Sequence, residues 1–386
     1  MDPAEFDAAG WDERGELPSE VRRAVAGAGW FGTDVAAEHG GRGGTQVELG
    51  ELCAEVGGSC GSVRALITVQ GMVAAALARW GTAAQRAHWL PALAAGEQLA
   101  GFAATEAGAG TELSGVDTRI ERTGGGFTVT GEKRWITFGR TASVFLVLGK
   151  LDGKPATVLV EAERAGVGVE PVRGQLGLRA AMIAHARFDR VRIPAGNLVA
   201  PPGFGLSHVA ATALDHGRFT VAWGCAGMAA TCVADAAAHT ARRQQGGVPL
   251  ADHQLVRSML ARMSVDATAA RQLCLAAAHA RDAGEPGAVA ATVMAKYAAA
   301  RAAASASQDA VQLLGSAGCA PDSRAGRFFR DAKVMQIIEG SDQVAELHIA
   351  EHLLRPHRTG GNGHATGEMP GLGPRRHPVA GRGAGG

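Results

Sequence analysis

The feature that most limits the fold of this chain is a change of residue pattern at two points. Residues 1–99 and 203–357 have the apolar spacing of helices, whereas residues 100–202 form short segments rich in Val, Ile, Thr and Phe. Short β-branched segments interrupted by Gly, Pro and Asp are typical of strands and hairpins. The second helical part is rich in Ala, the strongest helix former. The sequence therefore predicts an α+β protein with an N-terminal α-helical domain (1–99), a central β-domain (100–202) and a C-terminal helical bundle (203–357).

Within these parts the pattern predicts individual elements. Long helices are expected near 205–243, 250–282 and 287–314, and β segments are expected at 127–138, 142–163 and 185–194. The last part, 358–386, is rich in Gly and Pro and has almost no apolar residues. Such a composition cannot bury a core, so we expect a disordered tail there.

Charge and cysteine content exclude several classes of protein. The 38 basic and 37 acidic side chains give a net charge of +1, and no basic stripe is present, which argues against nucleic-acid binding. We find no apolar run of about 18 residues and no apolar signal segment at the acidic N-terminus, so we expect neither a membrane span nor secretion. The six cysteines include no C-x-x-C pair. They indicate reduced thiols in a cytoplasmic protein rather than a zinc or redox motif.

Two short motifs resemble catalytic signatures without their context. GGSCG at 57–61 fits the G-x-S-x-G nucleophile elbow, but a helical segment precedes Ser59 where that elbow needs a strand, so a helix–helix turn is favoured. HIAEH at 348–352 places His348 and His352 one helical turn apart, as in an inverted zinc motif. No third ligand is evident, so we expect solvent-facing histidines and no metal.

The segment MQIIEGSDQV, 335–344, places the carboxylate of Glu339 at the end of an apolar run, directly before Gly340. One interpretation is a solvated residue near a helix end, with Gly340 as its cap. The other is a carboxylate that faces an apolar pocket, where burial raises its pKa and makes it a base. The residues alone leave both interpretations open.

The segment FAATEAGAGTELSG, 102–115, follows a predicted strand and contains two glycines, Gly108 and Gly110. Free backbone N–H groups beside glycines can hold an anion such as a pyrophosphate, although an ordinary glycine turn has the same pattern. On the next β segment, Trp135 and Thr137 lie two residues apart and therefore share a strand face. An aromatic plane beside a hydroxyl suits a flat ring system, and a tryptophan of the β-domain core is the alternative.

Seven collinear motifs together resemble the acyl-CoA dehydrogenase family of flavoproteins, over about residues 15–355. They are EHGGRGG, FAATEAGAGTE, TGEKRWIT, LGLRAAMIAHARFDRVRIP, ARRQQGGVPLADHQ, QLLGSAGC and FFRDAKVMQIIEGSDQ. The resemblance implies the acyl-CoA dehydrogenase fold, which has an N-terminal helical domain, a central β-barrel-like domain and a C-terminal four-helix bundle. It also implies FAD as cofactor and a cytoplasmic homo-oligomer, either a dimer or a tetramer.

The resemblance assigns most cofactor contacts to two regions of the chain. The β-domain residues that match flavin and pyrophosphate contacts are Phe102, Ala104, Thr105, Gly110, Thr111, Trp135 and Thr137. The C-terminal residues that match FAD contacts are Arg243, Gln245, Gln312, Gly315, Ser316, Ser341 and Gln343. Of these, Arg243 and Gln245 match residues that reach the FAD of a neighbouring subunit. Thr111, Asp215 and Arg218 match residues near the substrate.

Glu339 matches the catalytic base of the family, 27 residues after Gln312. By this resemblance it removes the α-proton of an acyl thioester. The N–H of Gly340, together with a flavin ribose hydroxyl, stabilises the developing oxyanion. Some relatives carry the base at the position of Gly217, and glycine cannot serve there. An electron-transfer flavoprotein, or another acceptor, is expected to receive the electrons.

The short hairpin GKLDGKP stands where catabolic relatives carry a longer insertion near the nucleotide end of the carrier. Within the family the sequence is most similar to acyl-ACP dehydrogenases that serve methoxymalonyl-ACP extender units in polyketide clusters. This implies a small oxygenated acyl group on an acyl carrier protein (ACP), with a hydroxymalonyl-type product. A short-chain acyl-CoA dehydrogenase is the alternative, and a flavin monooxygenase of the same fold is a further one.

Overall fold

The computed structural model describes residues 2–358 and begins with a unit of five α-helices. Their bounds are α1 Ala8–Arg14, α2 Ser19–Gly27, α3 Gln46–Gly57, α4 Gly61–Trp80 and α5 Ala83–Ala94. A 3₁₀ turn, η1 Pro3–Glu5, precedes α1, and two more, η2 Trp30–Gly32 and η3 Ala37–His39, lie between α2 and α3. Helices α3 and α5 each start with a capping box, in which Thr45 and Thr82 pair with Glu48 and Gln85 three residues later. Ser59 lies in the turn between α3 and α4, which confirms the prediction of a helix–helix turn.

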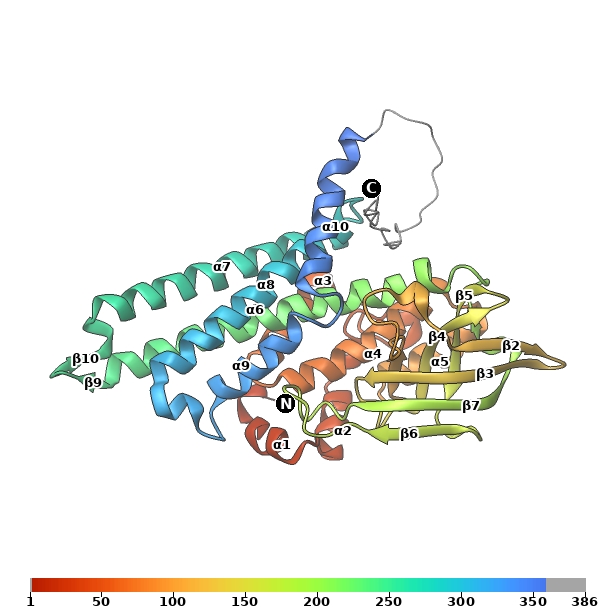
Figure 1. Ribbon diagram of the computed structural model, residues 1–386, viewed down its shortest axis with the longest axis horizontal. Coiled ribbons are helices and arrows are strands. Elements are labelled where there is room, and N and C mark those ends of the chain that lie inside the picture. Colours follow the sequence, from red (N-terminus) through yellow and green to blue (C-terminus); the bar gives the residue numbers. More distant parts are fainter. Residues whose placement is uncertain (1, 359–386) are drawn as a thin grey trace, which may run out of the picture.

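The central part is an eight-stranded mixed sheet (Figure 1). Its strands are β1 Ala100–Ala103, β2 Arg119–Thr123, β3 Gly126–Ile136, β4 Val144–Leu151, β5 Lys154–Glu161, β6 Val167–Pro171, β7 Ala184–Pro194 and β8 Leu198–Val199, with 3₁₀ turns η4 Leu113–Gly115 and η5 Ala195–Asn197. The strand order is β6-β7-β3-β2-β4-β5-β8, and β1 pairs with β4 in parallel. Asp152 and Gly153, both with positive φ, form the two-residue turn between β4 and β5, as a tight hairpin requires.

The C-terminal part is a bundle of long helices, with a tenth helix leaving it (Figure 1). Its elements are the π-helical turn η6 Gly205–Ala210, α6 Ala211–Arg242, β9 Gln244–Gln245, β10 Val248–Pro249, η7 Leu250–Asp252, α7 Gln254–Asp282, α8 Ala288–Leu314, η8 Gly315–Cys319, α9 Arg324–Met335, α10 Asp342–Leu354 and η9 Arg355–His357. Helices α6, α7, α8 and α9 pack on one another, and α10 packs on α8.

The N-terminal helices and the bundle share one hydrophobic core. Helix α3 lies close to α6 because its glycines leave room: Gly57 faces Gly224, and the ring of Trp223 occupies the space where a side chain at Gly50 would stand. A second core fills the sheet, with Phe145 and Phe188 in edge-to-face contact at 6.0 Å. The predicted order of helices, sheet and helical bundle is therefore confirmed.

Two helices bear on the expectation that the chain has no membrane span. Helix α4 and the continuous helix Gly205–Arg242 are each long and apolar enough to cross a membrane by length and composition alone. In the structure 89% and 56% of their most apolar windows are buried inside the protein, which is typical of core helices. The predicted disordered tail, apart from residue 358, lies outside the described residues.

Candidate active site

Glu339 lies in the turn between α9 and α10, and its backbone has an unusual conformation. Its φ is 56°, in the left-handed region that side chains other than glycine seldom adopt, and the φ of Gly340 is 96°. Two cations hold the carbonyls of this turn. Arg218 Nε on α6 donates to the Glu339 carbonyl at 2.8 Å, and Lys296 Nζ on α8 donates to the Gly340 carbonyl at 2.8 Å.

The turn directs the Glu339 carboxylate inward, onto α6. A Cβ atom built at Gly217 would lie 2.7 Å from the carboxylate carbon, so the carboxylate occupies the space that the glycine leaves. Its Oε2 atom is buried and has no hydrogen-bond partner within residues 2–358. Glu339 as a whole is half-buried, but this oxygen is enclosed and free to accept a proton, so the solvated interpretation of Glu339 is wrong.

Burial raises the pKa of Glu339 to about 7. The charges of Arg218, Lys296 and Arg64 oppose this rise, since a nearby cation favours the ionised carboxylate. Arg64 comes from α4, is 2% exposed, and donates to Thr68 Oγ1 and to Met335 Sδ, both at 3.0 Å. A carboxyl group with a pKa near neutrality is suited to act as a general base.

A small cavity of about 10 Å³ lies beside the base, with room for about one water molecule. Its polar lining consists of Glu339, Arg218, Lys296 and His348. His348 is half-buried, contrary to the expected solvent-facing position, and burial lowers its pKa. His352 is exposed, and within residues 2–358 no three His, Cys, Asp or Glu side chains are grouped as metal ligands.

In the β-domain, the other predicted centre, Trp135 is presented on the surface. The side chain is 56% exposed and the φ of the residue is 60°. Its backbone N–H donates to His185 Nδ1 at 3.2 Å, and the two rings are in edge-to-face contact at 5.5 Å. Thr137 follows directly after β3 and is half-buried. The expectation that the two residues share a strand face is wrong, because the positive φ of Trp135 and the irregular register between Lys133 and Ile136 interrupt the strand alternation. His185 therefore supports Trp135, although sequence reasoning did not single it out.

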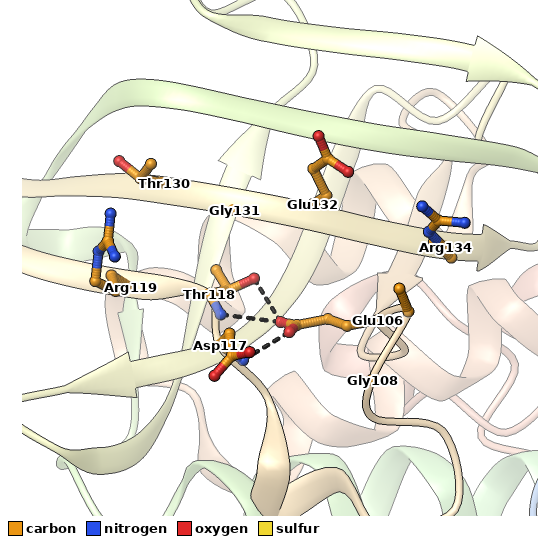
Figure 2. Close-up of a pocket in the computed structure, with 10 residues that line it drawn as sticks. Glu106, Gly108, Asp117, Thr118, Arg119, Thr130, Gly131, Glu132 and Arg134 are labelled. Carbon is orange, nitrogen blue, oxygen red and sulfur yellow. Dashed lines mark hydrogen bonds between the residues drawn. The ribbon is translucent and has the colours of Figure 1, made fainter.

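The loop from 104 to 118 is fixed by a buried ion pair between Lys133 and Glu106. Lys133 Nζ, 0% exposed, donates to Glu106 Oε1 at 2.7 Å and to the Ala104 carbonyl at 2.9 Å. Figure 2 shows the Glu106 carboxylate turned toward Asp117 and Thr118. It accepts hydrogen bonds from their backbone N–H groups at 2.6 and 3.0 Å. A cavity of about 250 Å³ opens against this loop. It lies at the β-domain and does not include Glu339.

The structure brings some of the predicted site residues together and separates others. Phe102, Ala104 and Thr105 lie at the end of β1, and Gly110 and Thr111 are exposed on the loop. Ser341 caps α10 by accepting the Val344 N–H, and Gln343 is exposed on its first turn. Two further groups, Arg243 with Gln245 and Gln312 with Gly315 and Ser316, are exposed at the ends of bundle helices. The hairpin β9–β10, which contains Gln245, lies at the end of the bundle far from the sheet (Figure 1).

The two predicted substrate residues on α6 already have protein partners. Asp215 Oδ2 accepts from Arg281 Nη1, whereas its Oδ1 is buried with no partner within residues 2–358. Arg218 holds the Glu339 carbonyl. Their roles toward substrate stay predictions.

The β-domain residues fit a flat aromatic cofactor. The exposed indole of Trp135 is fixed by His185, the half-buried Thr137 follows at the end of the same strand, and the space in front of Gly108 and Gly110 is open. Trp135 and Thr137 would hold the ring system, and the 108–111 backbone would hold its phosphates.

The chain is similar to known proteins along most of its length. Three family models match it: acyl-CoA dehydrogenase N-terminal domain at 4–97, middle domain at 101–191 and C-terminal domain at 205–354. It is 32% identical to a probable acyl-CoA dehydrogenase, YngJ of Bacillus subtilis, over 89% of this chain and 92% of that protein. The alignment with the structure of butyryl-CoA dehydrogenase from Megasphaera elsdenii has 28% identity and a TM-score of 0.87, and covers 92% of this chain and 94% of that one.

A further similar structure is described as FkbI for biosynthesis of the methoxymalonyl extender unit of the Fk520 polyketide. Here the identity is 39% and the TM-score is 0.86, with 92% of this chain and 99% of that chain covered. Together the three family models and these full-length similarities show that the chain belongs to the acyl-CoA dehydrogenase family, whose members are FAD-dependent oxidoreductases.

Proposed function

We propose that Glu339 is the general base of this acyl thioester dehydrogenase. The observation that carries the proposal is the enclosed carboxylate over Gly217, with one unpartnered oxygen and a pKa raised to about 7. An α-proton of a thioester is weakly acidic in water. A base poised near neutral pKa in a dry site combines a large ionised fraction with a strong affinity for that proton.

Charge that develops on the thioester oxygen also needs a donor. The backbone N–H of Gly340, next to the base, is proposed to donate a hydrogen bond to that oxygen, as in an oxyanion hole. The Gly340 carbonyl on the other side of the residue is already held by Lys296. When bound, FAD supplies the acceptor for the hydride that leaves the β-carbon.

Replacing Glu339 with Gln tests the base. The variant keeps the size of the side chain, so FAD should still bind, but flavin reduction by butyryl-CoA under anaerobic conditions should slow by at least about 10². Glu346→Gln, an exposed change on α10, is the matched control and should reduce flavin at the parent rate. Reduction at the parent rate by Glu339→Gln would place the base elsewhere.

The proposed substrate is a small oxygenated acyl group on an acyl carrier protein. Two observations support it: the β4–β5 connection is a two-residue turn, and the chain is 39% identical to FkbI. By the resemblance to catabolic relatives, a short connection here leaves less protein near the nucleotide end of CoA. The alternative substrate, a short-chain acyl-CoA, is favoured by the similarity to butyryl-CoA dehydrogenase. For either carrier we propose an electron-transfer flavoprotein, or a comparable protein, as electron acceptor.

The carrier is tested with one hydroxylated three-carbon acyl group loaded on CoA and on ACP. Carrier proteins are acidic, so their association with a basic docking surface should weaken as salt rises. We expect a higher second-order rate of flavin reduction with the ACP thioester, and a decrease of that rate at high salt. An equal or higher rate with the CoA thioester at low salt would identify a short-chain acyl-CoA dehydrogenase.

A further inference from the structure

Lys296 is a buried cation in a helix whose buried face is otherwise nearly apolar. It lies on α8 between Val293 and Ala299, and only 1% of the residue is exposed. Among the described residues, 2–358, its Nζ atom makes one hydrogen bond, to the carbonyl of Gly340 at 2.8 Å. Burying a lysine is costly unless its charge is used. A methionine would fill a similar volume without that cost.

We propose that Lys296 is a positioning residue for Glu339: it fixes the 339–340 turn so that the carboxylate stays over Gly217. This rests on the proposed function of Glu339. Glu339 and Gly340 both have positive φ, and this costly backbone conformation of the glutamate persists only where contacts from the surrounding structure hold it. Arg218 on α6 donates a hydrogen bond to the Glu339 carbonyl, and Lys296 on α8 donates one to the Gly340 carbonyl, so the two cations fix the orientation of both peptide groups.

The charge of Lys296 also acts on the base. The groups that face Glu339 are Arg218 on α6, Lys296 on α8, Arg64 on α4 and His348 on α10. Asp342, at the start of α10, acts on Lys296 with the opposite sign. Since a nearby cation lowers the pKa of a carboxyl group, removal of the Lys296 charge should raise the pKa of Glu339.

Three substitutions separate the hydrogen bond from the charge. Lys296→Met removes both, Lys296→Gln keeps a donor without charge, and Lys296→Arg keeps both. Lys333→Met is the matched control, because Lys333 is an exposed lysine on α9 whose side chain donates a hydrogen bond to Gln336 rather than to the 339–340 turn. Two quantities are measured against pH: the rate of flavin reduction by butyryl-CoA, and the infrared carboxyl band of Glu339, assigned by difference with Glu339→Gln.

We expect Lys296→Met to reduce flavin about tenfold to 10²-fold more slowly, since a displacement of about 1 Å at a catalytic group has effects of this size. In the Met and Gln variants, the midpoint of the infrared carboxyl titration and the pH at which the reduction rate rises should both be higher than in the parent. In the Arg variant both should be close to the parent values. A purely structural role would lower stability without moving either titration.

The outcomes separate this proposal from the assignment of the base. If Glu339→Gln is inactive but Lys296→Met has the parent rate and an unmoved carboxyl titration, the positioning role is wrong and the base stands. If Glu339→Gln is active, the base assignment fails, while the infrared titration still decides whether Lys296 acts on Glu339. If the Lys296→Met variant does not fold, the comparison of Lys296→Gln with Lys296→Arg decides. A Glu339 carboxyl titration that is unchanged in Lys296→Gln would then overturn the proposal.

Discussion

At the scale of single residues, the raised pKa of Glu339 predicts how stability depends on pH. The folded-state pKa is about 7, whereas an unfolded Glu titrates near about 4.3. Between these values the folded chain binds the proton more strongly, so its contribution to stability is present below about pH 4 and lost by about pH 7.

Glu339→Gln removes this titration. We therefore expect the variant to be more stable than the parent at pH 8, by on the order of 3 kcal/mol, and close to the parent at pH 4. Urea unfolding of both proteins at the two pH values measures the difference. If the difference in unfolding free energy between the two proteins were the same at pH 8 and at pH 4, the pKa of Glu339 would not be raised in the folded protein.

Gly217 provides a second prediction at this scale. A methyl group at 217 would lie 2.7 Å from the Glu339 carboxylate carbon, and the carboxylate can rotate away because it is the end of a flexible side chain. Gly217→Ala should therefore change stability little but slow flavin reduction by about 10² through displacement of the base. Gly124→Ala, where nothing lies within 4 Å, is the control. A Gly217→Ala variant with the parent rate would show that the carboxylate works from another position.

The residues that the sequence did not reveal are those whose role depends on a distant element. Lys296 and Arg64 resemble ordinary helix cations in sequence, yet both are buried. Lys296 binds the carbonyl of Gly340, which lies 44 residues later in the chain. One signal existed for Lys296, because it shares the helical face of Val293 and Ala300. The left-handed backbone of Glu339 had no such signal, since φ is set by the carbonyls that Arg218 and Lys296 hold.

At the scale of elements, the sequence was sufficient for helices and strands because their periodicity is local. The predicted helices near 205–243, 250–282 and 287–314 agree with η6–α6, α7 and α8, and the β segment 127–138 agrees with β3. The connection between β1 and β2, residues 104–118, was not predictable. It depends on the Lys133–Glu106 pair, which joins residues 27 positions apart.

Lys133→Met should loosen this connection. The lysine is fully buried, and removal of one partner leaves Glu106 as a charge that only Asp117 and Thr118 then satisfy. We expect a loss of about 3 kcal/mol in stability and weaker FAD binding, because the 104–118 loop carries predicted cofactor residues. Thermal unfolding and FAD titration of the apoprotein measure both, with exposed Lys154→Met on β5 as control. Unchanged FAD affinity would separate the ion pair from the cofactor site.

At the scale of the whole molecule, one chain does not bring all the predicted FAD contacts together. Trp135 and Thr137 lie at the sheet, whereas Gln245 lies on the hairpin at the opposite end of the bundle (Figure 1). A cofactor bound at both places needs the far end of a second chain. Large apolar side chains are also exposed on the outer helices: Leu255 and Val265 on α7, and Leu347 and Leu353 on α10. Contact with a second chain would remove these side chains from water.

We therefore predict a homo-oligomer, a dimer or a tetramer, in which Arg243 of one subunit stabilises the FAD of its neighbour. Light scattering should give a mass that is a multiple of the 39.4 kDa chain. Arg243→Glu should lower FAD content because it reverses a charge expected near the pyrophosphate, while the oligomer and the helical content stay intact. Arg242→Glu, an exposed change at the preceding residue, should keep FAD at the parent level. A monomer that retains one FAD per chain would contradict the shared site, since Arg243 and Trp135 of one chain could not then contact the same cofactor.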